Sequence, residues 1–120
     1  MQITISDFEA YLKRTYGGFA EKNGTALAEN NLFMKLVEEM GEVAEVINKR
    51  TGRKASDGSD LSAELGTELA DVIHYAVAIA AVNGLDLNNI IIEKDRKAAV
   101  KYNHEVNLET FINRMEPNDV

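Results

Sequence analysis

The sequence predicts an all-α protein of four or five helices with a bundle-like core. Apolar residues recur at spacings of three and four along most of the chain, and no segment alternates with the period of two that is typical of a strand. Capping residues and glycines lie at the ends of these periodic segments and indicate where helices begin and end. A chain of 120 residues with 45% apolar content can bury one hydrophobic core but is too short for two ordinary domains. We therefore predict a single domain over residues 1–120.

A first helix is predicted over residues 6–17. Ser6 and Glu9 have the spacing of a capping box, and Gly17-Gly18 supplies a stop. Helical intervals separate the apolar residues Ile5, Phe8 and Leu12. The polar segment "AEKNGTALAEN" is expected to form the following turn region.

The second helix is predicted to start between Thr25 and Asn31 and to end at about Arg50, where Gly52 follows as a C-cap. Its apolar face is expected to comprise Phe33, Leu36, Val37, Met40, Val43, Ala44 and Ile47. The segment "TGRKASDGSD", residues 51–60, is the one long loop, and its composition predicts a mobile surface segment.

Three further helices are expected. The third spans about 61–83 and ends at Gly84, and the fourth spans about 87–102 after an Asp86 cap, with Ile90, Ile91 and Ile92 packing inward. The last covers 108–115 after an Asn107 cap and stops before Pro117.

Composition excludes several classes of function. A net charge of −7 with interspersed acids and bases argues against a nucleic acid polymer or an anionic membrane as partner. The absence of cysteine excludes disulfides and thiolate metal sites, and the N-terminus lacks the features of a signal peptide, so we expect a cytoplasmic protein. The longest strongly apolar run, 72–82, is shorter than a membrane span of roughly 20 residues. It predicts a buried core helix.

Two acidic segments, "EEMGEVAE" at 38–45 and "ELADVIHY" at 68–75, stand out. Glu39 and Glu42 are three residues apart and project together from the rim of the apolar face of the second helix, because successive residues turn by about 100°. Glu68 and Asp71 have the same spacing on the third helix. The chain between the pairs is long enough to bring the helices antiparallel, which would let the four carboxylates converge.

Such a cluster must take up protons or hold cations. Unit charges about 4 Å apart repel by about 4 kcal/mol at an effective dielectric of about 20. Oxygen ligands without cysteine favour magnesium or manganese over zinc. A carboxylate site with open water positions suits the gripping of a polyphosphate and the activation of a water for attack on phosphorus.

Plainer interpretations apply to the neighbouring residues. Glu38 and Glu45, with Lys35 and Lys49, are expected to form a solvated face with i,i+4 pairs. The chain has two histidines, His74, which lies three residues after Asp71, and His104. A di-iron bundle needs the acid-x-x-His step twice and only one is present, so His74 is interpreted as structural or peripheral and His104 as solvated.

The two acidic steps, with the glycine inside the first and the long apolar continuation of the second, resemble the MazG-like branch of the all-α nucleoside triphosphate pyrophosphohydrolases. The resemblance covers about residues 30–102, the expected catalytic core. It implies an enzyme that cleaves a nucleoside triphosphate between the α and β phosphates to give the monophosphate and pyrophosphate. It also implies that Glu39, Glu42, Glu68 and Asp71 are the catalytic ligands of Mg²⁺, with Mn²⁺ as the alternative.

The resemblance also implies substrate-binding residues. Relatives carry a lysine in the fourth helix and an arginine-tyrosine pair about two turns later; here Lys94 matches, and Lys101 and Tyr102 stand at the pair. Ala98 replaces a common asparagine, which leaves the substrate open. Tyr75 matches an aromatic position near the nucleotide in some relatives, and a core tyrosine is the alternative.

Assembly into a homodimer or homotetramer is expected, since relatives complete their helical bundle in this way. Independently, the apolar residues of segment 72–82 run almost all round the third helix, which needs more cover than the neighbouring helices give.

The leading hypothesis is therefore a magnesium-dependent nucleotide pyrophosphohydrolase that clears unwanted nucleotides. A helical interaction or regulatory module that has kept the fold is the alternative. A di-metal carboxylate protein of redox type is disfavoured by the shortage of histidine ligands.

Overall fold

The computed structural model describes residues 1–115, which form five α-helices and no strand. The predicted all-α fold is confirmed. The helices are α1 (Ile5–Asn23), α2 (Thr25–Arg50), α3 (Leu61–Val82), α4 (Leu87–Lys101) and α5 (Leu108–Arg114). The predicted stop before Pro117 lies outside the described residues.

Two compact units divide the chain, one formed by residues 1–85 and one beginning at Asp86. The first holds α1, α2 and α3, and the second holds α4 and α5. That the whole chain acts as one domain stays a prediction.

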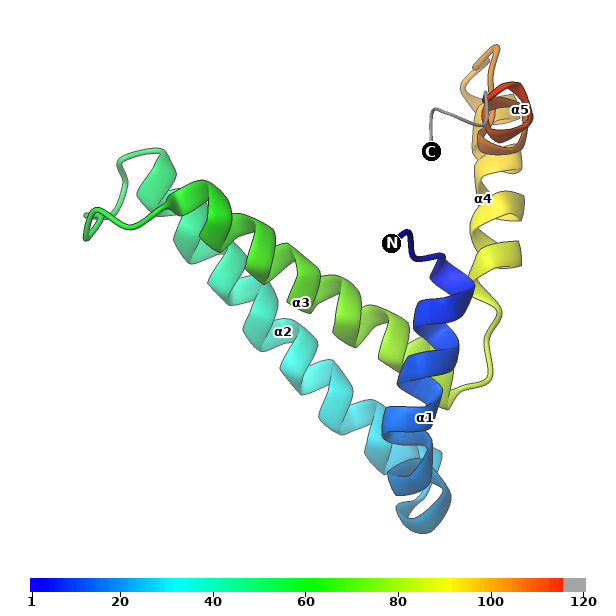
Figure 1. Ribbon diagram of the computed structural model, residues 1–120, viewed down its shortest axis with the longest axis horizontal. Coiled ribbons are helices and arrows are strands. Elements are labelled where there is room, and N and C mark those ends of the chain that lie inside the picture. The colour runs from blue at the N-terminus through cyan, green and yellow to red at the C-terminus, as the bar shows by residue number, and fades with distance from the viewer. Residues whose placement is uncertain (116–120) are drawn as a thin grey trace. The chain divides into compact units, whose positions relative to one another are not determined.

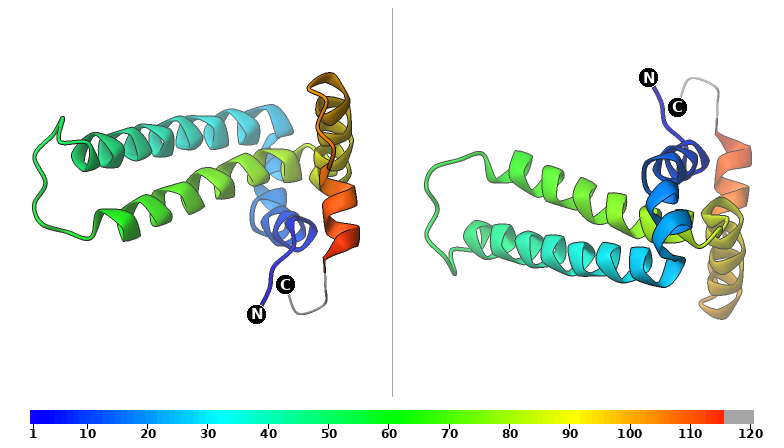
Figure 2. Two further views of the ribbon diagram at one scale, coloured as in Figure 1. Left: turned by 90° about the horizontal axis from the view of Figure 1, so that it is seen from above. Right: turned by 90° about the horizontal axis from the view of Figure 1, so that it is seen from below.

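Within the first unit, α2 and α3 lie side by side and antiparallel as a long hairpin (Figure 1). The loop 51–60 closes one end of the hairpin, and α1 packs against both helices near the other end, as the two views in Figure 2 also show. The antiparallel arrangement that the sequence predicted is therefore present.

Helix α1 begins earlier and ends later than predicted. Its capping box consists of Thr4 and Asp7, not Ser6 and Glu9: the Thr4 hydroxyl accepts from the Asp7 amide at 3.0 Å, and the Asp7 carboxylate accepts from the Thr4 amide at 3.3 Å.

The glycine pair does not stop α1. Glycine costs a helix interior about 1 kcal/mol relative to alanine, and here the buried residues Leu12 and Ala20 lie on both sides of the pair, so packing outweighs this cost. The helix ends instead at Gly24, whose φ of 98° lies in the region that favours glycine. The predicted turn region 20–30 is consequently helical except for this one residue.

The boundaries of α2 and α3 agree with the predictions. Helix α2 begins at Thr25, and the loop 51–60 is irregular as expected. The Asp60 carboxylate caps α3 by accepting from the amides of Ser62 and Ala63, both at 3.1 Å. An ion pair between Lys54 and Glu45 joins the loop to α2 and lowers the pKa of the Glu45 carboxyl.

The apolar face predicted for α2 is wrong in part, because the helix has two apolar faces. One face packs on α3 and α1 and carries the buried residues Ala28, Leu32 and Val46. The other face is open in the single chain. It carries Phe33, Val37, Met40, Ala44 and Ile47, at spacings of four, three, four and three, with Met40 55% exposed.

A matching pair of apolar residues is exposed on α3, namely Leu69 and Ile73. About the axis of α3, Leu69 and Ile73 point about 100° and 140° away from the direction of Glu68. About the axis of α2, the residues of the open face point away from the direction of Glu39 by similar angles, with the same direction of rotation. A two-fold axis perpendicular to the plane of two antiparallel helices exchanges the helices without exchanging the two sides of that plane. Residues of α2 and α3 that have equal angular offsets from the seam therefore lie on the same side of the hairpin. We call Phe33, Val37, Met40, Ala44, Ile47, Leu69 and Ile73 the open apolar face.

Helix α3 is also, within residues 1–115, the one helix with the length and composition of a membrane span, with a mean hydropathy of 1.4. Glu68 and Asp71 lie in its middle, where charged side chains are costly in hydrocarbon. Near its end Val77, Ala78, Ala80 and Ala81 are buried, so its apolar girth is partly covered by α1 and α2.

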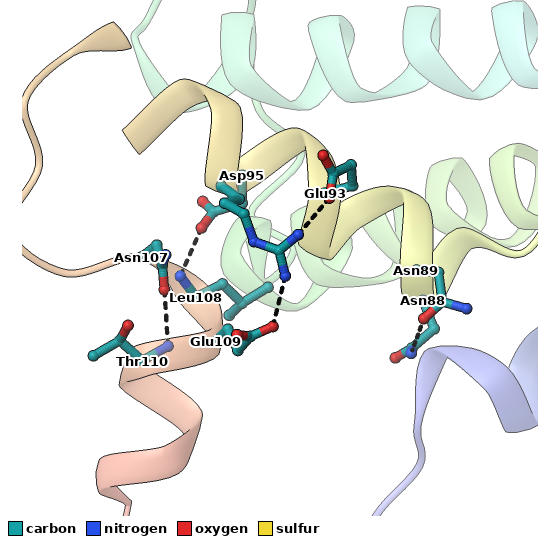
Figure 3. A network of polar contacts seen from close by, with 9 residues as sticks. Asn88, Asn89, Glu93, Asp95, Asn107, Leu108, Glu109 and Thr110 are labelled. Atoms are coloured by element: carbon teal, nitrogen blue, oxygen red, sulfur yellow. Dashed lines mark hydrogen bonds and ion pairs between the residues drawn. The ribbon is translucent and has the colours of Figure 1, made fainter. Parts of the chain in front are cut away.

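In the second unit, α4 and α5 are joined by polar contacts (Figure 3). The Asp95 carboxylate accepts from the Leu108 amide at 2.6 Å, and Arg96 pairs with both Glu93 and Glu109. The predicted caps Asp86 and Asn107 are confirmed, since they accept from the amides of Asn89 and Thr110 respectively.

The prediction that the three consecutive isoleucines pack inward is wrong for two of them. Ile90 and Ile91 are exposed, and Ile92 is half-buried. Three consecutive residues of a helix span about 200°, so α5 alone cannot cover all three isoleucines.

Candidate functional site

Three carboxylates meet in the seam between α2 and α3. Glu39 comes from α2, and Glu68 and Asp71 come from α3; each is half-buried, and one oxygen of each lies within 4.8 Å of the other two. Glu39 has the same orientation as the buried residues Leu32 and Val46, which are both seven residues away, two helical turns. Glu39 therefore lies in the seam itself rather than at the rim predicted from the sequence.

Glu42 lies apart from this group in the single chain and is exposed. It is nevertheless close enough for its charge to act on Glu68. Three residues advance a helix by about 300°, so Glu42 and Asp71 both point about 60° to one side of the seam. Because their offsets are equal, Glu42 and Asp71 lie on the same side of the hairpin. The open apolar face lies on the opposite side.

Partial burial, a hydrogen bond with Glu39 and the charges of Glu42, Glu39 and Asp71 all raise the pKa of the Glu68 carboxyl. The like charges are not balanced by any lysine or arginine in the described residues, since no ion pair involves these four acids. A cation would relieve this repulsion.

The donor set fits a hard divalent cation. Two oxygens on opposite sides of a magnesium ion lie about 4.2 Å apart, because each Mg–O distance is about 2.1 Å. Oxygens within 4.8 Å of one another can close on such an ion by small side-chain rotations. Within residues 1–115 the cluster has no histidine ligand, which agrees with an oxygen-only site.

A cavity of about 570 Å³ opens between α1, α2 and α3, and none of the four acids lines it. Its walls are largely apolar and aromatic, with a few polar groups. It is lined by Tyr16, Phe19, Ala28, Asn31, Leu32, Met34, Lys35, Glu38 and Tyr75. Tyr75, predicted from the resemblance to contact the substrate, is thus in the cavity wall.

His74 links α1 to α3 behind this wall. Its Nε2 lies 2.7 Å from the Tyr16 hydroxyl, and its ring makes edge contacts with Phe8, Tyr16 and Tyr75. Burial, with a smaller effect of Tyr75, raises the pKa of Tyr16, so its hydroxyl stays protonated at neutral pH. His74 therefore has the structural contacts expected of it, and His104 is exposed as expected.

Sequence reasoning missed the contribution of α1 to this cavity. Ending the first helix at Gly17 left Phe19 outside every predicted helix, whereas the interval from Leu12 through Tyr16 to Phe19 continues the helical periodicity. That interval is the signal that could have found both cavity residues. Glu38, expected on a solvated face with i,i+4 pairs, instead pairs with Lys35 three residues away, at 3.3 Å, and also lines the cavity.

The predicted phosphate contacts lie in the second unit. Lys94 and Lys101 are exposed, seven residues apart on α4, and the Lys101 ammonium lies 5.4 Å from the centroid of the exposed Tyr102 ring. Their role toward a substrate stays a prediction.

Comparison with known proteins covers most of the chain. A model described as "MazG nucleotide pyrophosphohydrolase domain" matches residues 28–105. A protein of Bacillus subtilis (strain 168), described as "Uncharacterized protein YpjD", is 32% identical over 85 residues, which are 71% of this chain and 72% of the relative.

Proposed function

Because the chain belongs to the MazG nucleotide pyrophosphohydrolase family, we propose that it hydrolyses a nucleoside triphosphate to the monophosphate and pyrophosphate. The observation that carries this proposal is the convergence of Glu39, Glu68 and Asp71 within 4.8 Å of one another. The two helices that hold these acids also contribute to a cavity of nucleotide size. Pockets for small ligands typically have volumes of about 300–1,000 Å³.

In this proposal the acids hold Mg²⁺ or Mn²⁺, with Glu42 as a fourth ligand. The bound ion would neutralise phosphate charge and lower the pKa of a water that attacks phosphorus. The role of the chain is to place the carboxylates in a fixed seam: α2 and α3 hold Glu39 and Glu68 opposite each other before any ligand arrives. Preorganised charges avoid the cost of reorganisation during the reaction.

The reaction is tested by incubating the protein with a panel of natural and modified nucleoside triphosphates, with magnesium, manganese or a chelator. We expect pyrophosphate and the monophosphate as products, and no turnover in the chelator. Ion chromatography separates the products. Orthophosphate from a β–γ cut would contradict the proposed bond specificity. Absence of turnover for the whole panel would instead favour a helical interaction module.

The lysines of α4 give a second test. If Lys94 and Lys101 neutralise phosphate charge, Lys94→Ala should raise KM and lower kcat by about tenfold, the order of a charge-assisted hydrogen bond. Lys97→Ala is the matched control, because Lys97 is on the same helix, is 77% exposed and lies 4.0 Å from Glu93. Steady-state kinetics of both variants measure the difference. Equal, small effects would make Lys94 a surface charge only.

We also propose that the chain assembles as a homodimer or homotetramer through the open apolar face. Large aliphatic side chains contribute about 1.5–3 kcal/mol each when fully buried, and this face leaves seven apolar residues uncovered in the single chain. The spacings of four and three along α2 are those of helix–helix seams. A cytoplasmic location, without membrane or nucleic acid polymer as partner, and a role in clearing unwanted nucleotides complete the proposal.

A further inference from the structure

Two lysines gather beside one carboxylate where α2 meets the loop 51–60. Lys49 belongs to the last turn of α2, and Lys54 belongs to the loop. The Lys54 ammonium lies 2.5 Å from a carboxylate oxygen of Glu45. The hydrogen bond and the charge of Lys54, followed by the charge of Lys49, lower the pKa of the Glu45 carboxyl. Two cations therefore act on this one carboxylate, and Lys49 also acts on Asp57 of the loop.

The backbone of the loop directs Lys54 back along α2. Gly52 has a φ of 79°, which reverses the chain after the helix. The carbonyl of Asn48 then accepts hydrogen bonds from the amides of Arg53 and Lys54, at 2.9 and 3.2 Å. An exposed ion pair contributes little to the free energy of unfolding, so stabilising the loop is a minor effect of the pair between Lys54 and Glu45.

The two lysines lie on the same side of the hairpin as Glu42. About the axis of α2, Glu45 and Lys49 point about 120° and 80° away from the direction of Glu39, with the same direction of rotation as Glu42. Lys54 contacts Glu45 on this side. The open apolar face lies on the opposite side, so a second protomer that covers that face would leave both lysines accessible.

The lysines also lie at a suitable distance from the acids. Glu45 follows Glu39 by six residues, which is about 9 Å along α2 in the direction of the loop. Side chains of a helix lean toward its N-terminus, so Glu45 and Lys49 lean back toward the acids. The flexible stem of Lys54 lets its ammonium swing farther in that direction. A triphosphate with its α phosphate at the acids has two more phosphates, which extend toward the lysines.

The charge of the substrate favours such neighbours. A nucleoside triphosphate is strongly anionic, and the proposed metal site is itself made of carboxylates. Hydrogen bonds between an ammonium and a phosphate are strong because both partners are ionised. Lys49 and Lys54 belong to the first unit, in the same hairpin as the acids. Their placement toward the acids is therefore fixed by the hairpin itself.

We infer that Lys54, with Lys49 beside it, binds the terminal phosphate of the nucleoside triphosphate and so recognises the length of the phosphate chain. This inference rests on the proposed function, since it takes the α phosphate to lie at the acids. In the chain without ligand, Lys54 pairs with Glu45. A terminal phosphate carries a charge of about −1.5 to −2, more than one carboxylate, and replaces Glu45 as the partner of Lys54. After cleavage the same contact holds the pyrophosphate.

Product inhibition tests the contact, because the two products carry different phosphates. Pyrophosphate contains the terminal phosphate, and the monophosphate does not. Lys54→Met should raise both the inhibition constant Ki of pyrophosphate and the KM of the triphosphate by about tenfold, the order of one charge-assisted hydrogen bond. The Ki of the monophosphate should stay unchanged. Equal Ki values of pyrophosphate for the variant and the wild-type protein would overturn the inference.

Three matched variants separate phosphate binding from loop structure and from overall charge. Lys54→Arg keeps the charge and should retain most of the affinity for pyrophosphate. Glu45→Gln breaks the same ion pair but keeps the lysine, so it should not raise Ki. Lys22→Met removes one positive charge from the exposed last turn of α1 and should also leave Ki unchanged. A Ki raised as much by either of these two variants as by Lys54→Met would contradict the phosphate contact.

A binding measurement distinguishes failure of this inference from failure of the proposed function. Isothermal calorimetry with inorganic pyrophosphate and magnesium needs no turnover, and Lys54→Met should raise Kd by about tenfold. If no nucleotide of the panel is hydrolysed, a Kd that depends on Lys54 would uphold the pyrophosphate site and overturn the reaction. Hydrolysis with the same Kd for Lys54→Met and the wild-type protein would overturn the site and uphold the reaction.

Discussion

Replacing Glu68 with glutamine is expected to lower turnover by about a hundredfold or more, since even outer partners of metal ligands typically contribute 10–100-fold. One oxygen of Glu68 lies within 4.8 Å of an oxygen of Glu39 and of an oxygen of Asp71. The amide keeps the size of the side chain but removes the charge that would hold the cation. Steady-state hydrolysis at saturating magnesium, with isothermal calorimetry of Mn²⁺ binding, measures both losses.

The same variant should stabilise the metal-free protein at neutral pH. The pKa of Glu68 is raised in the folded chain, so folding favours its protonated form. The wild-type protein is therefore expected to lose stability as the pH rises from the ordinary glutamate pKa through the raised one, and to stay less stable above it. Glu68→Gln should remove this loss, which thermal unfolding in chelator between pH 4 and pH 8 measures.

Controls define the ligand set. Glu45→Gln is a matched control on α2, because Glu45 pairs with Lys54 at the surface. It should retain full turnover. The four-ligand prediction requires losses for Glu39→Gln, Asp71→Asn and Glu42→Gln comparable to that of Glu68→Gln. Near-full activity of Glu42→Gln would restrict the ligands to the three acids of the seam.

A charge placed in the open apolar face is expected to separate the protomers. Ile73→Glu should weaken association by about a hundredfold or more, because an unpaired buried charge costs several kcal/mol. Ile73 is 51% exposed in the single chain, so the substitution leaves the packing of α3 on α2 largely intact. Light scattering at low micromolar concentration should show the variant near 13.3 kDa and the wild-type protein at a multiple of that mass.

Ile3→Glu is the control for this variant. Ile3 is 70% exposed and lies outside the open apolar face, and its substitution introduces the same charge in place of the same side chain. It should leave the mass of the assembly unchanged. A wild-type protein that is fully active at a mass near 13.3 kDa would contradict the assembly.

The helices could be predicted from local chemistry, because caps and turns act through neighbouring residues. The side chains of Asp60, Asp86 and Asn107 accept hydrogen bonds from backbone amides two or three residues later in the chain. Local sequence is therefore sufficient to predict these helix starts. The glycine pair misled the prediction for α1, because burial of Leu12 and Ala20 depends on helices that lie elsewhere in the chain.

The acidic pairs could likewise be found from spacing, but their depth could not. When a helix has two apolar faces, its sequence shows one broad apolar surface around the helix axis. Only the position of the neighbouring helix α3 decides which part of that surface is buried. For that reason Glu39 was expected at a rim and lies in the seam. The cavity depends on the path of α1 across the hairpin, which no local pattern specifies.

Most of the buried residues in the described part of the chain are alanines, including Ala20 of α1 and Ala78, Ala80 and Ala81 of α3, which do not line the cavity. Interaxial distances of about 8–10 Å depend on the side chains at the contact, so these methyl groups act as spacers that set how closely the helices approach. Evolution can therefore enlarge the cavity without touching its walls: one alanine replaced by a larger residue would move α1 outward. The size of the cavity can therefore change through positions that do not line it.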